Sequence, residues 1–370
     1  MTKITGAKGK VVVGMSGGVD SSVAAYILIQ QGFEVIGLHM KSSNSETSAE
    51  DEKSARLVAD KLGIELVVID YDDEMQQVKD YFINEYKSGK TPNPCVLCNK
   101  IVKFKPFIEY AEKINADFFA TGHYARIEHL RKGHILFSGA ELAKDQSYFL
   151  NQLSQEQLAK VLFPLGNLNK SEVRELAQKI GLDNANKKDS YDVCFLGSQK
   201  FKKYIDSVIP EKQGDIIDIS TNKVVGKHSG LSKYTLGQRK GLGIGGGFGK
   251  TLDAWFVAKK DLKTNTLFVE QGNGESLYSD TILVSGFNWI PNCPECEIEC
   301  LAKFRYRQDF QSVKAKVIAN GVVEIVCSEK QRAVTPGQFA VLYKQENDKY
   351  KCLGGGTIKL LKRDGKELDL

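Results

Sequence analysis

The stretch of sequence that decides the fold is Lys10-Val11-Val12-Val13-Gly14-Met15-Ser16-Gly17-Gly18-Val19-Asp20-Ser21-Ser22. Its β-branched run predicts a buried strand, and a helix is expected to begin at about Asp20. Between them, Gly17 and Gly18 permit backbone conformations that are closed to other residues, and the serines offer hydroxyl groups. Because the positive end of the helix faces this loop, the stretch predicts a site that binds phosphate.

The loop has no lysine, which separates it from the G-x-x-x-x-G-K-[ST] loop. It resembles the S-G-G-x-D-S loop of the pyrophosphatase-type ATP-using enzymes. That resemblance implies cleavage of ATP between the α and β phosphates and adenylation of a substrate oxygen. A simple Gly/Ser turn is the alternative, but strand, loop and helix all agree with the first interpretation. The expected ATP contacts are Gly14, Met15, Ser16, Gly17, Gly18, Val19, Asp20, Ser21, Met40 and Gly122.

Outward from this loop, the first third of the chain alternates between strand and helix patterns. Buried strands are expected at 10–13, 34–39, 64–69 and 117–121, and helices at 21–31, 49–62, 74–86 and 99–114. The repeated βαβ units predict an α/β fold with a doubly wound parallel sheet. Ligands bind beyond the carboxyl ends of such strands, where Met40 could pack against adenine and Gly122 could let the backbone approach ATP.

The remainder of the chain predicts two further domains. Ser154-x-x-Gln157 and Asn169-x-x-Glu172 are capping-box patterns that open two more helices. From about Ile205 glycine, lysine, threonine and short alternating strands dominate, and the C-terminal part predicts a small antiparallel β-barrel. We therefore expect a catalytic domain at 1–204, a central adaptor domain at 205–275 and a barrel at 276–370.

Composition narrows the class of protein. The chain has 370 residues, and its 42% hydrophobic content is enough for packed cores. A net charge of +5 permits a nucleic-acid partner without requiring one. No apolar run is long enough to span a bilayer and the N-terminus does not read as a leader, so we expect a cytoplasmic protein with no membrane partner. In a reducing cytosol the 8 cysteines are expected to be reactive or metal-binding.

Two cysteines lie in a proline-rich segment, Thr91-Pro92-Asn93-Pro94-Cys95-Val96-Leu97-Cys98. Cys98 is expected near the start of a helix, where the helix end and the lysines at 100, 103 and 105 would lower the pKa of its thiol. Cys194 lies far along the chain in a short apolar segment, where a small buried side chain is the simplest interpretation. By itself the C-x-x-C pair fits half of a zinc site, a redox pair or cluster ligands.

Taken together, these motifs resemble the bacterial tRNA-specific 2-thiouridylases, and the likeness runs almost end to end. Many separate matches in the right order are more specific than any single one. They are Gly14–Ser21, Thr91–Pro94 with Cys98–Lys100, Ala120–Tyr124, Lys144–Leu150, Asp192–Phe195, Leu236–Gly243, Arg305–Gln308 and Thr335–Gln338.

The resemblance implies a reaction in which ATP, with Mg²⁺, activates O2 of the wobble uridine and sulfur replaces that oxygen. It also implies that Cys194 receives sulfur as a persulfide, that Cys98 acts as nucleophile, and that the two can end as a disulfide bond. The chemistry is consistent, because adenylation makes the oxygen a good leaving group and a second thiol can break an S–S bond by exchange. The base must leave its stack to reach such a pocket.

The family further implies partners: tRNAs for Lys, Glu and Gln, and a persulfide sulfur donor such as a cysteine desulfurase or a relay protein. The barrel and the central domain would help to clamp the anticodon arm, and the glycine-rich segment 236–249 could order on tRNA. For the charged runs, a solvated polar face is the alternative. The expected tRNA contacts are Asn93, Pro94, Cys95, His123, Lys144, Asp145, Gln146, Arg305, Tyr306 and Gln338.

One position departs from the family pattern. Many members carry Asp where this chain has Cys95, and a thiol does not reproduce the charge of a carboxylate at neutral pH. The substitution leaves Cys95, Cys98 and Cys194 as three thiols that could converge on a [4Fe–4S] cluster whose free iron binds hydrosulfide. The residues are therefore compatible with both mechanisms, the persulfide relay and the cluster.

Other interpretations also stay open at this point. An AMP-forming amide ligase could use the same ATP loop, and a non-catalytic tRNA-binding protein could keep the same fold, but neither accounts for the loop and the cysteines together. Near the C-terminus, Cys293-x-x-Cys296-x-x-x-Cys300 could bind metal with Cys327 or Cys352. We favour strand packing, in which Cys296, Ile298 and Cys300 share one inward face.

Overall fold

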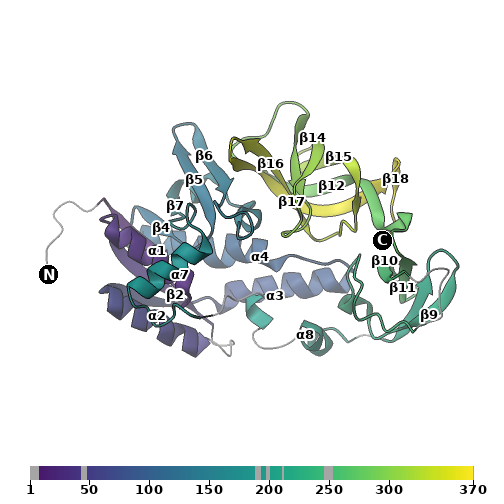
Figure 1. Cartoon of the computed structure of the whole chain (residues 1–370), viewed down its shortest axis with the longest axis horizontal. Coiled ribbons are helices and arrows are strands. Elements are labelled where there is room, and N and C mark those ends of the chain that lie inside the picture. Colours follow the sequence, from purple (N-terminus) through teal and green to yellow (C-terminus); the bar gives the residue numbers. More distant parts are fainter. Residues whose placement is uncertain are drawn as a thin grey trace.

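The computed structural model describes residues 8–42, 48–187, 193–196, 201–210, 212–245 and 253–369. A parallel sheet with its helices lies at the N-terminal end of the molecule, a barrel lies above the middle, and a small sheet lies at the opposite end (Figure 1). This arrangement confirms the expected α/β fold with a smaller middle unit and a C-terminal antiparallel barrel.

The first sheet is entirely parallel, in the order β3-β2-β1-β4-β7. Its strands are β1 (Lys10–Gly14), β2 (Glu34–Lys41), β3 (Glu65–Asp70), β4 (Phe118–Ala120) and β7 (Val161–Leu162). The valine run is fully buried: Val11 and Val13 face one core and Val12 faces the other. Helices therefore cover both faces, as the alternating pattern predicted.

The helices that cover this sheet begin close to their predicted positions. They are α1 (Val19–Gln30), α2 (Ser48–Leu62), α3 (Asp72–Lys87), α6 (Gln155–Lys160) and α7 (Lys170–Lys179). A further helix, α8 (Phe201–Val208), was not predicted and packs against the far end of α3. Both capping boxes form, at Ser154 of α6 and at Asn169 of α7. None of the helices in the described ranges is long and apolar enough to cross a bilayer.

The helix that carries Cys98 differs from its prediction. It begins at Pro94 rather than Asn99 and consists of α4 (Pro94–Leu97), a π-helical stretch η1 (Cys98–Phe104) and α5 (Lys105–Lys113). Cys98 therefore lies about one turn inside the helix and opens the π stretch. Wide turns of this kind are frequent at functional sites because they re-aim the side chains around them.

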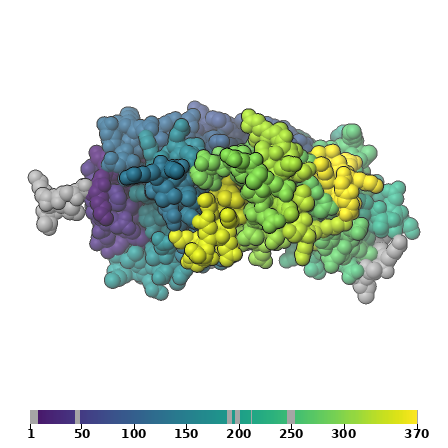
Figure 2. Space-filling model, turned by 90° about the horizontal axis from the view of Figure 1, so that it is seen from above, coloured from purple at the N-terminus to yellow at the C-terminus, as the bar shows by residue number. Residues whose placement is uncertain are grey.

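A hairpin joins the N-terminal unit to the barrel. Strands β5 (Ala125–Leu130) and β6 (Gly133–Ser138) extend the barrel sheet, with Phe137 opposite Lys351. Seen from above, the C-terminal strands lie directly against the N-terminal unit (Figure 2). Short 3-10 turns, η2 (Ser147–Leu150) and η3 (Cys194–Leu196), lie in the segments that follow.

The barrel consists of antiparallel strands and closes where β12 pairs with β17. Its strands are β12 (Tyr278–Trp289), β13 (Ile298–Lys303), β14 (Gln311–Ala319), β15 (Val322–Arg332), β16 (Phe339–Glu346) and β17 (Lys349–Arg363), with β18 (Lys366–Glu367) paired to β17. We predicted that Cys296, Ile298 and Cys300 share one inward face of a strand, and this prediction is wrong for Cys296. Cys296 is exposed before β13 begins, whereas Cys300 is half-buried on that strand opposite Val313.

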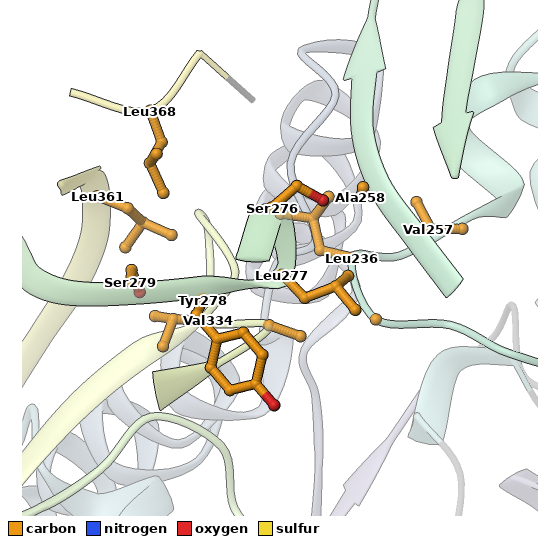
Figure 3. Close-up of a pocket in the computed structure, with 12 residues that line it drawn as sticks. Leu236, Val257, Ala258, Ser276, Leu277, Tyr278, Ser279, Val334, Leu361 and Leu368 are labelled. Atoms are coloured by element: carbon orange, nitrogen blue, oxygen red, sulfur yellow. The ribbon is translucent and has the colours of Figure 1, made fainter. Parts of the chain in front are cut away.

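The small sheet has the order β10-β11-β8-β9, and its β8–β11 pair is parallel. Its strands are β8 (Gly214–Asp218), β9 (Lys223–His228), β10 (Trp255–Asp261) and β11 (Thr266–Gln271), with 3-10 turns η4 (Leu231–Lys233) and η5 (Glu275–Leu277) nearby. Its junction with the barrel is apolar, since Leu236, Val257, Leu277, Leu361 and Leu368 line one small pocket (Figure 3). Of the predicted glycine-rich loop at 236–249, residues 246–249 lie outside the described part of the chain.

Gly122 lies two residues after β4 and packs against the start of α1. A Cβ built at Gly122 would lie 2.8 Å from the carbonyl carbon of Asp20 and 2.8 Å from the amide nitrogen of Ser21. Both are backbone atoms, so no side-chain rotation can relieve the contact. Glycine is therefore needed here so that the segment after β4 and the start of α1 can approach each other; the predicted approach of its backbone to ATP stays a prediction.

Gly122→Ala should lower the free energy of unfolding by about 1–3 kcal/mol, the usual cost of overpacking a close contact. Urea unfolding of the purified chain measures the change. Gly245→Ala is the matched control, because a Cβ there meets no described residue within 4 Å and both substitutions change the entropy of the unfolded chain alike. Equal unfolding midpoints for the two variants would contradict the close approach.

Candidate active site

The phosphate loop is held in shape by neighbouring segments. Gly17 has φ +74°, and a Cβ on it would lie 2.4 Å from the carbonyl oxygen of Asp51. The carbonyl oxygen of Gly17 accepts hydrogen bonds from Ser54 Oγ at 2.8 Å and from Asn184 Nδ2 at 3.1 Å. The left-handed turn and the lack of space make glycine necessary at this position.

The serine hydroxyls of the loop serve the loop itself. Ser21 Oγ accepts from the Ser16 amide at 3.2 Å and donates to the Gly18 carbonyl at 3.1 Å. Ser22 Oγ donates to the same carbonyl at 2.9 Å. These bonds pre-shape the loop, and the first N–H groups of α1 point out of the helix without intrahelical acceptors. A phosphate would be bound mainly by backbone donors.

Asp20 is engaged by two residues from distant segments. Lys170 Nζ donates to both carboxylate oxygens, at 2.7 and 2.8 Å, and the Tyr124 hydroxyl donates to Oδ1 at 2.8 Å. Lys170 is only 8% exposed and is the first residue of α7. Lys170 was not among the residues expected at the site, and its position directly after the Asn169 cap is the only local signal that points to it.

The other expected ATP residues divide into backbone and side-chain positions. Met15 and Val19 are buried in the core against β1 and α1, so only their backbone faces the loop. Gly14 ends β1 against the ring of Phe107. Met40 is half-buried and packs against the cluster that contains Cys98. The end of the second strand thus links the nucleotide side of the site to the thiols.

The structure brings Cys98 and Cys194 together. The Cys98 thiol donates a hydrogen bond to the sulfur of Cys194. Cys98 is 6% exposed and packs with Met75, Val78 and Val102, whereas Cys194 is exposed in η3. The simplest interpretation of Cys194 from sequence, a small buried side chain, is therefore wrong, while the expected convergence of the two thiols is confirmed.

The proton shared by the two thiols shifts their pKa values in opposite directions. Accepting the hydrogen bond lowers the pKa of Cys194 to about 6, and the positive charge of Lys103 acts in the same direction. Donating that bond, together with burial, raises the pKa of Cys98 well above its usual range. The expectation that a helix end would lower the pKa of Cys98 is wrong, because the residue lies inside the helix and holds the proton.

Cys95 lies close to this pair but does not complete a metal site. It is half-buried, and burial together with the charge on Cys194 raises the pKa of its thiol to about 11. Across the described ranges, no group of three His, Cys, Asp or Glu side chains is arranged to hold a metal ion. The described residues thus give no support to the predicted iron–sulfur cluster, which stays a prediction. Asp192, next to the Cys194 segment, lies outside the described residues.

Several residues expected to contact tRNA make internal contacts in the structure. Asp145 is 2% exposed and accepts from the amides of Gly139 and Ser147, both at 3.0 Å. Gln146 Oε1 accepts from the Tyr124 amide at 2.9 Å. His123 is 8% exposed, bonds Thr121 Oγ1 at 2.7 Å, and burial holds its pKa well below the usual range. A neutral, buried imidazole does not supply a cation for phosphate.

The remaining candidates lie where the units meet. Tyr306 packs its ring on Phe149 at 4.4 Å between centroids, and positive charges on Lys144 and Arg307 lie near its hydroxyl. Arg305 Nη2 donates to the carbonyls of Leu236 and Ala333 and to Thr335 Oγ1. Asn93 caps α4 by accepting from the Cys95 amide at 3.2 Å, and Pro94, the first residue of α4, is buried.

Three family models match consecutive parts of the chain. The model described as a tRNA methyl transferase HUP domain matches residues 9–198, and that of a tRNA methyl transferase PRC-barrel domain matches 202–271. The model described as an aminomethyltransferase beta-barrel domain matches 279–358. The matched ranges correspond to the parallel sheet, the small sheet and the barrel.

Solved structures show more distant and partial similarity. A 4-thiouridine synthetase–RNA complex with bound ATP is 20% identical, with a TM-score of 0.35 over 55% of this chain and 50% of that chain. The U34-tRNA thiolase NcsA from Methanococcus maripaludis, solved with its [4Fe-4S] cluster, is 21% identical, with a TM-score of 0.35 over 52% and 64%.

Curated relatives match over almost the whole length. The tRNA-specific 2-thiouridylase MnmA of Listeria monocytogenes serotype 4b is 47% identical over 369 residues, 97% of each chain. The protein of the same name from Bacillus thuringiensis is 45% identical over the same length. The phosphate loop and the paired thiols are consistent with this similarity. The chain belongs to the tRNA-specific 2-thiouridylase family.

Proposed function

We propose that this protein is a tRNA-uridine 2-sulfurtransferase, which uses ATP to replace O2 of the wobble uridine by sulfur. The observation that carries the proposal is the hydrogen-bonded pair of an exposed Cys194 and a buried Cys98 beside the carboxyl end of β2. Neither an amide-forming ligase nor a protein that only binds tRNA needs such a pair of thiols. Relatives at 47% identity are named for this thiolation.

ATP is the first substrate, and the phosphate loop would bind its phosphates. The backbone donors at the start of α1 face the phosphates, and Gly17 and Gly18 allow a close approach. Asp20 would hold Mg²⁺ on the pyrophosphate, with Lys170 and Tyr124 keeping its carboxylate in place. Transfer of AMP to the uridine O2 breaks the bond between the α and β phosphates and releases pyrophosphate.

Sulfur then passes through Cys194. Its thiolate attacks the outer sulfur of a donor persulfide, and the donor leaves as a thiol, so that Cys194 carries S–SH. The outer sulfur attacks C2 of the adenylated uridine, and AMP leaves with the oxygen. Cys98 attacks Cys194 Sγ, which releases 2-thiouridine and forms a Cys98–Cys194 disulfide. A cellular thiol reductant must restore the two thiols before the next turnover.

The two thiols differ in ways that suit these separate tasks. Cys194 is exposed and its lowered pKa makes it a thiolate at neutral pH, which favours attack on an incoming persulfide donor. Cys98 is buried and protonated, so it does not compete for the donor. Its hydrogen bond already places it against the sulfur that it attacks later.

The tRNA side of the proposal rests on the junction surface. The half-buried ring of Tyr306 packs on Phe149, and the positive charges of Lys144 and Arg307 act on its hydroxyl. An aromatic ring with nearby cations is a combination suited to stacking on a base beside phosphates. The tRNAs for Lys, Glu and Gln are the proposed substrates, and a cysteine desulfurase or relay protein is the proposed sulfur donor. We propose that the protein acts in the cytoplasm.

Cys98→Ser and Cys194→Ser should each abolish 2-thiouridine formation, because each removes one sulfur that the transfer needs. Mass spectrometry of nucleosides from tRNA incubated with ATP and a persulfide donor measures the product. Cys293→Ser is the control, since that thiol is exposed at the barrel and bonds only the carbonyl of Pro294 among the described contacts. Full thiolation by either catalytic variant would refute the relay.

Asp20→Asn should slow tRNA-dependent pyrophosphate release by about tenfold or more, as expected when a charged contact is lost. A coupled pyrophosphate assay with saturating tRNA measures this step apart from sulfur transfer. Asp215→Asn, which breaks an exposed ion pair with Lys227 in the small sheet, is the control. Unchanged pyrophosphate release would exclude Asp20 from ATP use, and release that depends on ammonia instead of tRNA would favour an amide ligase.

The rate of Cys194 alkylation by iodoacetamide should rise with pH through a midpoint of about 6, because only the thiolate reacts. In Cys98→Ala the donated hydrogen bond is lost, and the midpoint should move up toward the ordinary cysteine value of about 8.5. Peptide mass spectrometry follows each thiol separately. Cys296→Ala should leave the midpoint where it was; the same midpoint in Cys98→Ala would show that Cys98 does not set it.

A further inference from the structure

Thr91 opens the segment that leads into the Cys98 helix, and both other units of the molecule hold it. Its N–H donates to the carbonyl of Pro336 at 3.0 Å, and its own carbonyl accepts from Gln338 Nε2 at 2.7 Å. Its hydroxyl donates to Thr235 Oγ1 at 3.3 Å. Every polar group of this buried residue is thus bound to the barrel or to the loop that follows η4.

The barrel side of this contact is a rigid turn, Thr335–Gln338, here named the barrel turn. The Gly337 amide donates to the carbonyl of Ile358 at 3.0 Å, and the Ile358 amide donates to the carbonyl of Gln338 at 2.8 Å. Arg305 Nη2 donates to Thr335 Oγ1 at 2.7 Å. The turn is therefore fixed to β17 at one end and to an internal arginine at the other.

Glycine at 337 lets the two segments approach each other. Its φ is +92°, and a Cβ there would lie 3.1 Å from the Thr91 carbonyl carbon and 3.1 Å from Lys90 Cβ. A larger residue would be strained in this conformation and would press on the backbone of Thr91. The contact is a close fit between backbones as well as a pair of hydrogen bonds.

A short, stiff link connects Thr91 to the thiol. Pro92 and Pro94 lock φ at two of the next three residues. Between them, Asn93 accepts from the Cys95 amide at 3.2 Å and hydrogen-bonds the hydroxyl of Tyr148. That hydroxyl donates to the carbonyl of Phe339, which directly follows the barrel turn. Cys98 lies one helical turn beyond Pro94, so a shift of Thr91 would be passed on through this stiff link to the Cys98 helix.

We propose that the barrel turn is a positioning element of the reaction centre: by holding Thr91 it sets where the Cys98 helix begins and keeps the Cys98 thiol against Cys194. Gln338 and Gly337 are positioning residues in this scheme. The sequence had assigned Gln338 to the RNA. An RNA that accepts a hydrogen bond from the Gln338 side-chain amide must displace the Thr91 carbonyl from it. Such an RNA would therefore act on the position of the Cys98 helix.

The test uses the full chain without tRNA or ATP, so its result does not depend on the thiolation proposed above. Gln338→Met removes the donor at similar volume, and Gly337→Ala adds a Cβ against Thr91. Alkylation of Cys98 by iodoacetamide should become about fivefold faster in each variant, the change expected for local opening when one hydrogen bond is lost. Diamide should form the Cys98–Cys194 disulfide correspondingly more slowly.

The matched control is Gln345→Met, because this barrel glutamine donates to the carbonyl of Asn347 within its own hairpin. It should show wild-type rates for both reactions. Circular dichroism melts confirm that each variant is folded, and Gln338→Glu, which places a carboxylate opposite the Thr91 carbonyl, replaces any variant that is not.

Wild-type rates of Cys98 alkylation and disulfide formation in the folded variants would overturn the proposal. If those rates were wild-type and a separate tRNA-binding assay on the same variants showed weaker affinity, Gln338 would serve the RNA and not the thiol. An equal acceleration in Gln345→Met would also overturn it, because the effect would then belong to the barrel as a whole and not to the turn.

Discussion

The hydrogen bond between Cys98 and Cys194 is the interaction on which the chemistry of this molecule depends. It joins a buried thiol on a helix to an exposed thiol on a short turn far along the chain. One proton shared between two sulfurs leaves one of them charged and the other neutral, so the two acquire different roles without a change of residue type. Cys98 lies on the helix of residues 94–113, so the bond depends on where that helix is docked.

That docking draws on all parts of the molecule. The π stretch from Cys98 packs on Met75 and Val78 of α3, and Met40 at the end of β2 lies against the same cluster. The barrel turn and Thr235 hold the residues before the helix. Because each of these contacts comes from a different segment, the thiol site is a property of the assembled chain and not of the C-x-x-C motif.

The phosphate loop and the polar motifs are likewise held by contacts between segments that are distant in the sequence. Lys170 and Tyr124 fix Asp20, and Tyr124 is in turn bonded to Gln146. Asp145 satisfies two backbone amides in a buried loop, where an unpaired donor would cost more than the bond contributes. Residues that look like RNA contacts in the sequence thus also build the loops that would carry such contacts.

The sequence alone determined the α/β sheet, the barrel and the phosphate loop, because hydrophobic periodicity and turn chemistry are local signals. The buried valine run and the capping boxes at Ser154 and Asn169 are examples. Tertiary structure alone decided the pKa order of the two thiols, the partnership of Lys170 with Asp20 and the hold of the barrel on Thr91. Charge, burial and hydrogen-bond partners are set by groups far apart in the chain, and no local pattern encodes which of them will meet.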